Sequence, residues 1–504
     1  MYELLIKKLK VKNKIIFEAP NRSPLTYSDL IEKMANLQTE FHKLRIEPSD
    51  PVAIVLPNGP DLGVLFLASA CFGIAAPLNP NYSKKEFLFF LKDLDAIVLI
   101  TDPSIKSNAP SAASELGIPI INLVQNDKAG DFSLKPSTTI LPKSGKFSFF
   151  NNQISLLLHT SGTTSKPKLV QLTADNLIHS ATNIGNILKL SERDSCLNIM
   201  PLFHIHGLVA VFLASILFQG RLICSSGFNP LTFFKLVKEY KPSWYSGVPT
   251  MHQAILQRAV KNQEIIKLNT FRFIRSSSAA LPTPVLKELE NTFKCPVIEA
   301  YGMTEAAHQI ASNQLPPRVR KPGRVGVAAG PEVKIIGKDG KDLPINCVGE
   351  IIIKGRNIFK SYANNPEATS NSFYRSWFKT GDLGALDSDG YLQISGRIKE
   401  IINKGGEKVS PNEIDDTIQE IPAIAQVVCF AIKDDKYGED IGCAIVLKSG
   451  MTITEKEIIS YCSEYLAKFK VPKKFLFLDE IPKGPTGKIQ RIGLARKLGL
   501  NNAR

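Results

Sequence analysis

Short apolar runs alternate with stretches of helical spacing along the first part of the chain. Residues 26–44 carry apolar side chains at helical intervals, and VAIVL (52–56) predicts a short buried strand. A helix is expected next in PNGPDLGVLFLASACFG (57–73), and the pair repeats in SKKEFLFFLKDLD (83–95) and AIVLIT (96–101). Repeated strand–helix units of this kind predict a mostly parallel sheet with helices packed on it.

The pattern changes further along the chain. Strand–helix units continue to VIEAYG (297–302), but residues 104–152 are rich in Pro, Ser, Asn and Gly and are expected on the surface. Short strands with turn sequences predict a β-rich part over 324–393, and helices flanking strands beyond residue 400 predict a small α+β domain. The predicted fold is α/β, with a large N-terminal domain of parallel-sheet subdomains and a β-rich subdomain, followed by this small domain.

The composition is that of a folded protein of two or more domains. The chain has 504 residues, of which 44% are apolar and 22% are charged. Its longest apolar runs, 64–72 and 208–218, fall short of the ~18 residues that suggest a membrane span. The first residues do not resemble a secretory signal and the last do not form a peroxisomal Ser-Lys-Leu tail, so the cytoplasm is the expected compartment.

Charge and cysteine content exclude little. The balance of 62 basic and 47 acidic residues gives a net charge of +15, which attracts anions, and nucleic acid is a possible partner on charge alone. The lysines are spread along the chain without an aromatic–basic motif, so we predict no nucleic-acid partner. The eight cysteines show no CxxC pairs or metal spacing, and we expect small buried apolar residues rather than disulfides.

The stretch TSGTTSKPK (160–168) is the strongest local signal for chemistry. Its hydroxyl residues, glycine and two lysines are typical of a loop that wraps phosphate oxygens, although it lacks the spacing of a Walker loop. ISLLLH before it predicts a strand and ADNLIHSATNIGNIL after it predicts a helix, so we expect the loop between a strand and a helix. On this stretch alone, an ordinary solvated loop is the alternative.

Three later motifs occur in the order known from one superfamily. They are YGMTE (301–305), TGD (380–382) followed by GRIKE (396–400), and PTGKIQR (485–491). With the phosphate loop they resemble the adenylate-forming superfamily of acyl-CoA synthetases, nonribosomal adenylation domains and beetle luciferases, over residues 25–491. The resemblance implies an N-terminal AMP-binding domain (1–395), a hinge (396–400) and a mobile C-terminal domain (401–504).

By this resemblance, residues of all four motifs bind ATP and AMP. The implied set is Thr160, Ser161, Gly162, Thr163, Thr164, Ser165, Lys168, Tyr301, Gly302, Thr304, Asp382, Arg397 and Lys488. Tyr301 would stack on adenine, and Thr304 would contact the α-phosphate. Asp382 would accept hydrogen bonds from both ribose hydroxyls, with support from Arg397. Glu305 would hold Mg²⁺.

The implied reaction activates a carboxylate as its adenylate and then transfers the acyl group to coenzyme A. The catalytic residues implied are Lys488, Glu305, Thr304 and His204. Lys488 would bridge the acid and the α-phosphate, and Lys399 would be the hinge residue of a domain alternation. Gly405, Gly406 and Glu407 would line the path of coenzyme A.

Two residues of the phosphate loop depart from the superfamily pattern. Ser165 replaces a common glycine and still supplies a hydrogen-bond donor, so we expect little effect. Leu169 replaces the glycine that usually follows the last lysine. Because leucine has a restricted φ, it predicts a stiffer exit from the loop, which bears on ATP affinity rather than on the reaction.

Polar residues follow the strands that should border the acid. PLFHIHG (201–207), RSSSAAL (275–281) and TEAAH (304–308) offer imidazoles and hydroxyls, which suit a small, doubly charged acid and would be left unpaired by a long alkyl chain. Four longer blocks resemble the oxalate–CoA ligases most, which implies oxalate as the substrate: EAYGMTEAAHQIASNQLPP (299–317), WYSGVPTMHQAIL (244–256), GRIKEIINKGGEKVSPNEID (396–415) and LAKFKVPKKF (466–475). The implied oxalate contacts are His204, His206, Ser278 and His308. The alternative is that they only brace the adenine and the strand ends.

Other functions stay open at this stage. A ligase for a coumarate-like or medium-chain fatty acid would use the same chemistry, and a luciferase-like oxygenase would also form an adenylate. A non-catalytic anion- or nucleic-acid-binding protein would keep the fold, but one feature argues against loss of catalysis: the presence of Glu305, Asp382, Arg397 and Lys488. The oligomeric state is not predicted.

Overall fold

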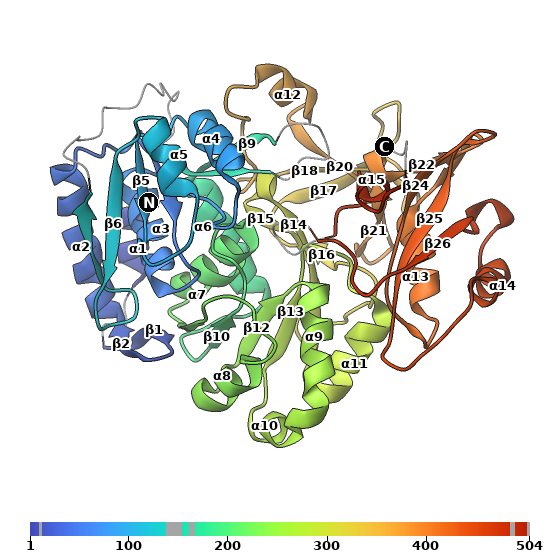
Figure 1. Ribbon diagram of the computed structural model, residues 1–504, viewed down its shortest axis with the longest axis horizontal. Coiled ribbons are helices and arrows are strands. Elements are labelled where there is room, and N and C mark those ends of the chain that lie inside the picture. The colour runs from blue at the N-terminus through green and yellow to red at the C-terminus, as the bar shows by residue number, and fades with distance from the viewer. Residues whose placement is uncertain (10–12, 138–153, 161–166, 484–488, 501–504) are drawn as a thin grey trace.

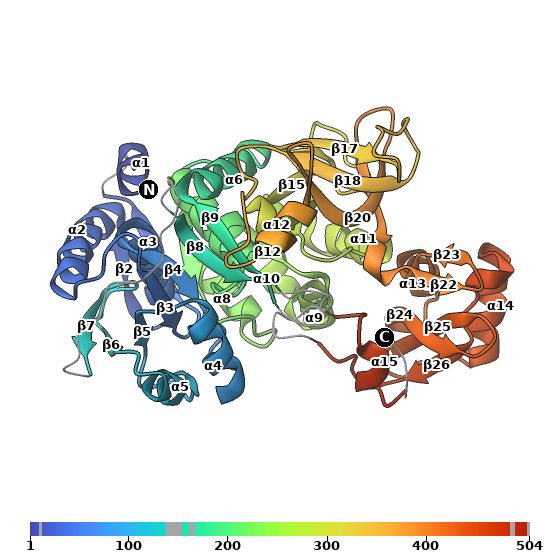
Figure 2. The ribbon, with the colours of Figure 1, turned by 90° about the horizontal axis from the view of Figure 1, so that it is seen from above.

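The chain folds around four β-sheets in this computed structural model, which describes residues 1–9, 13–137, 154–160, 167–483 and 489–500. Three sheets make up the large N-terminal part (Figure 1). The fourth sheet belongs to the C-terminal part, drawn in orange to red, which lies at one end of the molecule (Figure 2). The predicted α/β class, with a large N-terminal and a small C-terminal domain, is confirmed.

The first sheet has seven strands in the order β7-β6-β5-β3-β4-β8-β9. The strands are β3 (Pro51–Val55), β4 (Ile74–Pro77), β5 (Val98–Thr101), β6 (Ile120–Gln125), β7 (Phe132–Pro136), β8 (Ile154–His159) and β9 (Leu169–Thr173). The five inner strands are parallel, whereas β7 and β9 at the edges are antiparallel to their neighbours. The helices of this part are α1 (Tyr2–Lys8), α2 (Tyr27–Lys43), α3 (Pro60–Phe72), α4 (Lys84–Asp93) and α5 (Ala109–Glu115).

The second sheet has nine strands in the order β16-β15-β14-β13-β12-β10-β11-β1-β2. The strands are β1 (Ile15–Ala19), β2 (Arg22–Thr26), β10 (Ser195–Asn198), β11 (Arg221–Cys224), β12 (Trp244–Gly247), β13 (Phe273–Ser276), β14 (Val297–Met303), β15 (His308–Ser312) and β16 (Val327–Ala328). The helices are α6 (Ala174–Ile187), the π-helix η1 (His206–Leu213), α7 (Ala214–Leu217), α8 (Phe233–Tyr240), α9 (Pro249–Ala259), α10 (Gln263–Leu268) and α11 (Thr283–Phe293). The repeated strand–helix units predicted from the sequence are present in both sheets.

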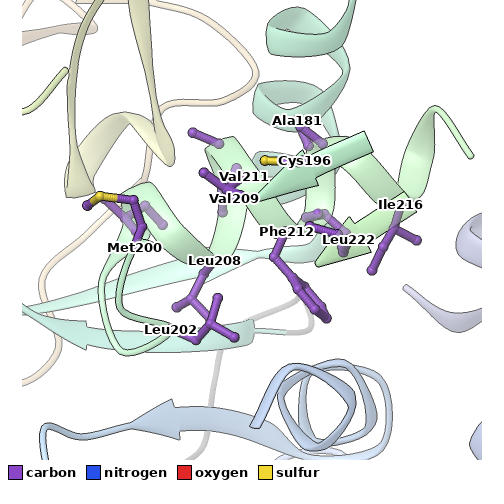
Figure 3. Packing of buried hydrophobic residues seen from close by; sticks show 14 of the residues in the cluster. Ala181, Cys196, Met200, Leu202, Leu208, Val209, Val211, Phe212, Ile216 and Leu222 are labelled. Atoms are coloured by element: carbon purple, nitrogen blue, oxygen red, sulfur yellow. The ribbon is translucent and has the colours of Figure 1, made fainter. Parts of the chain in front are cut away.

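The two large sheets share one apolar core. Every residue of α3 is buried, and the helix packs on strands of both sheets. Phe212 of η1 stacks on Phe17 at a centroid distance of 5.5 Å, and a Cβ on Gly63 of α3 would lie 2.2 Å from its ring. Figure 3 shows Phe212 and its apolar neighbours on η1 packed toward Leu202 and Leu222. This packing holds the π-helix, and therefore His206 at its first turn, in a fixed place.

Helix ends follow local sequence signals. Thr26 caps α2 by accepting a hydrogen bond from the Asp29 amide, while the Asp29 side chain accepts from the Thr26 amide. Ser83 and Thr173 cap α4 and α6 in the same reciprocal way. In the described residues, no helix is long and apolar enough to cross a membrane.

The remaining sheets are mainly antiparallel. The β-rich part holds β17 (Glu332–Ile336), β18 (Gly349–Lys354), β19 (Phe373–Tyr374), β20 (Trp377–Leu386) and β21 (Leu392–Arg397), with helix α12 (Pro366–Asn371). The C-terminal part holds β22 (Ile402–Lys404), β23 (Glu407–Val409), β24 (Ile424–Asp434), β25 (Gly438–Leu447) and β26 (Lys474–Phe477), with α13 (Pro411–Gln419), α14 (Glu455–Tyr465) and α15 (Leu494–Lys497). Both parts were expected from the change in sequence pattern.

The expectation that residues 104–152 form a surface segment is wrong for its described part. Helix α5 and strands β6 and β7 lie there, and Ile121, Leu123 and Phe132 are buried. The strands are only six and five residues long, and β7 has just one fully buried residue. Strand β6 takes its place in the sheet by pairing with β5, and β7 takes its place by pairing with β6, which the local sequence does not reveal.

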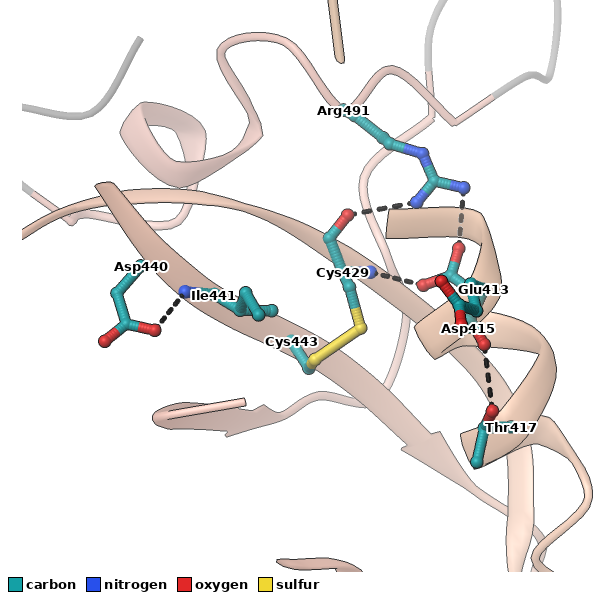
Figure 4. The surroundings of a disulfide bond; sticks show 8 residues. All are labelled: Glu413, Asp415, Thr417, Cys429, Asp440, Ile441, Cys443 and Arg491. Atoms are coloured by element: carbon teal, nitrogen blue, oxygen red, sulfur yellow. Dashed lines mark hydrogen bonds and ion pairs between the residues drawn. A yellow bond between two sulfur atoms is a disulfide. The ribbon is translucent and has the colours of Figure 1, made fainter. Parts of the chain in front are cut away.

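The expectation that the cysteines form no disulfide is also wrong. Cys429 of β24 and Cys443 of β25 are bonded (Figure 4). They are directly opposite in the antiparallel register, which brings their Cα atoms to 4.1 Å. Sequence spacing carries no trace of this, because it depends on strand register. The other six cysteines are free, and all but Cys347 are buried as predicted.

Candidate active site

Tyr301, Asp382 and Arg397 lie together although they are far apart in the sequence. Tyr301 belongs to β14, and Asp382 and Arg397 are directly opposite in β20 and β21. The Tyr301 hydroxyl donates to Asp382 Oδ2, and Arg397 Nε lies 3.2 Å from Asp382 Oδ1. Burial raises the pKa of the Asp382 carboxyl, and the charge of Arg397 opposes that rise. The three residues expected around adenine and ribose thus form one connected group.

A second buried carboxylate, Glu305, lies beside Tyr362 and Lys168. Glu305 is in the 3₁₀ turn η3 (Thr304–Ala306), and the Tyr362 hydroxyl donates to its Oε1 at 2.9 Å. Lys168 Nζ lies 4.6 Å from the centroid of the Tyr362 ring. Burial raises the pKa of Glu305, whereas the Tyr362 hydroxyl and the charges of Arg397 and Lys168 lower it.

The residue predicted at the hinge, Lys399, is close to this group. It lies in η4 (Ile398–Glu400), which directly follows β21. Burial lowers the pKa of Lys168, the positive charge of Lys399 lowers it further, and Glu305 raises it. Arg397 is balanced by Asp382, whereas Lys168 and Lys399 bring positive charge near Glu305 that attracts phosphate.

The phosphate loop joins two strands, so the expectation that it lies between a strand and a helix is wrong. Strands β8 and β9 pair antiparallel, and the Thr160 amide donates to the Lys168 carbonyl at 2.9 Å. The short β9 precedes α6 and was missed because the helical pattern dominates this stretch. Leu169 is its buried first residue, where an extended conformation suits leucine. The loop residues Ser161, Gly162, Thr163, Thr164 and Ser165 lie outside the described residues.

Gly302 is required by the close approach of two backbones. A Cβ at this position would lie 1.7 Å from the carbonyl oxygen of His308. Any other residue would therefore push His308 away from β14. Thr304 begins η3, and its carbonyl accepts from the Ala307 amide at 2.9 Å. The YGMTE motif thus sets the position of His308 as well as that of Tyr301 and Glu305.

His206, Ser278 and His308 form a polar cluster at the ends of three elements. His206 begins η1, Ser278 follows β13, and His308 begins β15. His206 Nδ1 lies 3.0 Å from Ser278 Oγ, and the rings of His206 and His308 stack with centroids 4.9 Å apart. Both imidazoles are buried. Three of the four residues predicted to bind the acid are therefore brought together.

The fourth residue, His204, lies next to this cluster and is half-buried. Its Nδ1 accepts a hydrogen bond from the His206 amide at 3.2 Å. Neighbouring Ser277 has a structural contact instead, because its hydroxyl donates to the Ala300 carbonyl at 2.9 Å. Of the serines in RSSSAAL, it is Ser278 that contacts a histidine of the cluster.

The backbone of the cluster is strained. Ser278 and His308 have φ angles of +75° and +91°, and Ala307 before His308 has +45°. Such conformations are unfavourable for residues with a side chain and persist where the surrounding structure enforces them. Strain at two of the three clustered residues indicates that their side-chain directions matter to the protein.

Four side chains that the sequence analysis did not single out complete the site. They are Ser246, Arg275, Gln309 and Tyr362. Ser246 lies in WYSGVPTMHQAIL (244–256) and Arg275 begins RSSSAAL (275–281), two stretches whose other features were used in the sequence analysis. Tyr362 lies in a stretch without any motif. Their roles depend on contacts between strand ends, which the local sequence does not show.

In the C-terminal part, the charged side chain of Arg491 connects the segment after Lys488 to the rest of the structure. Lys488 lies outside the described residues, but Arg491 is described. Arg491 Nη2 lies 2.6 Å from Asp415 in α13, and Nη1 donates to the Cys429 carbonyl at 3.0 Å (Figure 4). Its Nε lies 3.3 Å from Glu400 in η4. The segment after the PTGK sequence is thereby tied to both the predicted hinge and the small sheet.

Gly405 and Gly406 form the tight turn between β22 and β23. Their φ angles of +60° and +97° are in the region that favours glycine, and Lys404 pairs directly with Glu407. The turn explains both glycines without a ligand, so their predicted contact with coenzyme A stays a prediction.

Comparisons with known proteins agree with this geometry. The family model described as AMP-binding enzyme matches residues 8–363, and that of the AMP-binding enzyme C-terminal domain matches residues 413–488. The chain is 42% identical over 470 residues to an oxalate–CoA ligase of Arabidopsis thaliana, covering 92% of this chain and 91% of the relative. It is 39% identical over 503 residues to an oxalate–CoA ligase of Saccharomyces cerevisiae, with 94% and 92% covered.

A solved structure is similar over almost the whole chain. The crystal structure of ATP-bound MatB from Rhodopseudomonas palustris matches with a TM-score of 0.88 at 27% identity, covering 99% of this chain and 98% of that chain. The order of the motifs, the two matching family models and the full-length relatives all agree. The chain therefore belongs to the AMP-binding enzyme family, and it is an AMP-forming acyl-CoA ligase.

Proposed function

We propose that the enzyme joins oxalate to coenzyme A through an oxalyl-adenylate, with release of AMP and pyrophosphate. The observation that carries the proposal is the cluster of His206, Ser278 and His308. Oxalate has a second carboxylate bonded directly to the reacting one, and imidazole and hydroxyl groups are suitable donors to it. A long alkyl chain would leave these buried groups unpaired, which costs free energy. The plant and yeast relatives support the same substrate.

In the first step, an oxygen of the acid attacks the α-phosphorus of ATP, and pyrophosphate leaves. Two anions must meet, so cations near both must offset their repulsion. Lys168 and the loop 160–168 would hold the β- and γ-phosphates, while Lys488 would bridge the acid and the α-phosphate. His204, beside His206, would complete the acid site. The product is a mixed anhydride whose carbonyl is open to attack, with AMP as the leaving group.

The nucleotide would be held by the group around Asp382. Its carboxylate, fixed by Tyr301 and Arg397, would accept from the ribose hydroxyls. The ring of Tyr301 would stack on adenine, with Gly302 leaving room for the backbone, and Thr304 would contact the α-phosphate.

Glu305 would hold a magnesium ion beside the nucleotide phosphates. Such an ion needs only one or two protein carboxylates and takes its remaining ligands from phosphate and water. Glu305 is a buried carboxylate with Lys168 nearby, and the Tyr362 hydroxyl contacts its Oε1. In the described residues no group of three or more metal-ligating side chains is present, so a closed protein cage is not the expected arrangement. The ion would supply charge neutralisation at the phosphates.

In the second step, the thiol of coenzyme A attacks the adenylate carbonyl and AMP leaves. We propose that the C-terminal domain turns about Lys399 between the two steps, so that Lys488 withdraws and the turn of Gly405, Gly406 and Glu407 approaches the site. Because Lys399 joins a strand of the N-terminal part to the small domain, a change of its backbone angles would move that domain as a unit.

Pyrophosphate release over a panel of acids tests the proposal. Oxalate, malonate, glyoxylate, a medium-chain fatty acid and 4-coumarate are compared with ATP, Mg²⁺ and coenzyme A present. We expect the highest kcat/KM with oxalate and an absolute requirement for coenzyme A in thioester formation. No turnover of oxalate contradicts the proposal, and a preference for the fatty acid or coumarate favours the alternative ligases.

A further inference from the structure

The guanidinium of Arg275 is a fully buried charge beside His206 and His308 of the polar cluster. Arg275 is the third residue of β13, and its exposed fraction is 0%. Burial lowers the pKa of Arg275 to about 9, which leaves the side chain positively charged at neutral pH. Its Nε is buried and has no hydrogen-bond partner among the described residues.

The partners of Arg275 are neutral groups. Nη1 donates to His206 Nε2 at 3.3 Å, and Nη2 donates to His308 Nε2 at 3.0 Å and to Gln309 Oε1 at 3.1 Å. In the part of the chain that the structure describes, Arg275 makes no ion pair with a carboxylate. By contrast Arg272, three residues earlier, pairs with Asp194 at 2.8 Å. A buried cation without a counter-ion is costly, so its presence calls for a reason other than stability.

Arg275 also fixes which nitrogen of each imidazole carries the proton. A guanidinium can only donate, so His206 Nε2 and His308 Nε2 must accept and the ring protons lie on Nδ1. This choice agrees with Ser246, whose Oγ lies 2.7 Å from His206 Nε2 and can donate to it. His206 Nδ1 then donates to Ser278 Oγ, which leaves the hydroxyl proton of Ser278 for another acceptor.

We propose that Arg275 is a positioning residue that makes the acid pocket selective for a doubly charged substrate, and this inference rests on the proposed function. Acting through His206, His308 and Ser278, the guanidinium aligns donors toward the second carboxylate. That carboxylate supplies the negative charge that Arg275 lacks within the protein. A monocarboxylate leaves the cation uncompensated and binds less well.

Steady-state kinetics with oxalate and glyoxylate test this role, because glyoxylate keeps the two-carbon frame and lacks the second carboxylate. In Arg275→Met, which keeps the side-chain volume and removes the charge, we expect the preference for oxalate to fall about tenfold or more. The loss should appear as a higher KM for oxalate, while the KM for ATP is unchanged. Arg275→Lys keeps the charge but not the forked geometry, and should retain part of the preference.

Arg272→Met is the matched control. It removes an arginine next to the same strand and breaks the pair with Asp194, so it should lower the thermal midpoint and leave the acid preference unchanged. An unchanged preference in both folded Arg275 variants overturns the inference. If Arg275→Met does not fold, a preference in Arg275→Lys equal to that of the wild type overturns it.

The outcomes for Arg275 and for oxalate can be separated. If the wild type prefers another dicarboxylate, the proposed substrate is wrong, and the Arg275 variants are compared on that acid and its monocarboxylate counterpart. If the Arg275 variants lose the preference for that dicarboxylate over its monocarboxylate counterpart, the positioning role of Arg275 is supported although oxalate is not the substrate. A wild type that uses only monocarboxylates overturns both ideas.

Discussion

At the residue scale, Asp382 and Glu305 are buried carboxylates that each accept a hydrogen bond from one tyrosine. The partners are Tyr301 and Tyr362, and burial raises the pKa of both acids. A buried acid that must stay ionised depends on donors to its charged form. A tyrosine-to-phenylalanine substitution at either position therefore removes one hydroxyl group. Its effect on the pKa of the carboxylate that it contacts can then be measured.

Tyr362→Phe should move the acid limb of the pH profile to higher pH. The Tyr362 hydroxyl donates to Glu305 and lowers its pKa, so without it the pKa of Glu305 rises further above the ordinary value. Ionised Glu305 then appears only at higher pH, and more Mg²⁺ is needed at neutral pH. The measurement is kcat/KM for ATP as a function of pH and Mg²⁺ concentration. We expect a loss of about tenfold at neutral pH, equivalent to ~1.4 kcal/mol.

Tyr301→Phe is the matched control for that experiment. It removes a hydroxyl from Asp382 and should raise the KM for ATP, with no change in the Mg²⁺ requirement. Equal shifts of the acid limb in both variants would mean that the limb reports general damage to the nucleotide site. An unshifted limb in Tyr362→Phe would remove Glu305 from the metal role.

At the element scale, the alternation of apolar and helical patterns predicted most strands and helices of the two large sheets. The sequence pattern failed where strand pairing decides the structure, as in β7 and β9, which are edge strands of only five residues each. The same limit applies to the site. YGMTE and TGD identify Glu305 and Asp382, but Tyr362 and Arg275 acquire their roles from contacts made only when separate strands meet.

Besides Asp382 and Glu305, the acid Glu299 of strand β14 is buried, and it should make the free energy of unfolding depend on pH. Burial raises its pKa to about 8 from 4.5, with Glu290 and Asp416 adding to the rise and Arg320 and the Gly323 amide opposing it. The folded state therefore holds this proton more tightly than the unfolded chain. The contribution to stability is complete below pH 4.5 and is lost as the pH rises to 8.

Glu299→Gln should remove that loss, because glutamine is neutral and similar in shape. We expect the variant to exceed the wild type in stability above pH 8, by on the order of 5 kcal/mol at most, and to differ little below pH 4.5. Thermal midpoints recorded from pH 4 to 9 measure the difference. Glu332→Gln, at an exposed position of β17, serves as the control. A Glu299→Gln midpoint that runs parallel to the wild type at every pH contradicts the prediction.

At the scale of the whole molecule, the site is assembled from both parts of the chain. β14, β20 and the phosphate loop belong to the N-terminal part, whereas Lys399 and Arg491 connect it to the C-terminal part. Arg491 is bonded to Glu400 of η4 as well as to Asp415 and Cys429 of the small domain. A rotation about the hinge would carry the PTGKIQR segment and the small sheet together.

Lys488→Ala tests whether the two half-reactions use different arrangements of these parts. If Lys488 bridges the acid and the α-phosphate, its loss should abolish adenylate formation, because no other group would neutralise both anions. Thioester formation from supplied acyl-adenylate should keep most of its rate, since AMP is already attached and only the thiol must enter. The readouts are pyrophosphate release for the first half and AMP release from the adenylate for the second. Lys483→Ala, which alters a lysine paired with Glu480 in the same segment, should impair neither half. An equal loss of both halves in Lys488→Ala would show that the lysine supports the fold or both steps, and the alternation about Lys399 would lose its chemical basis.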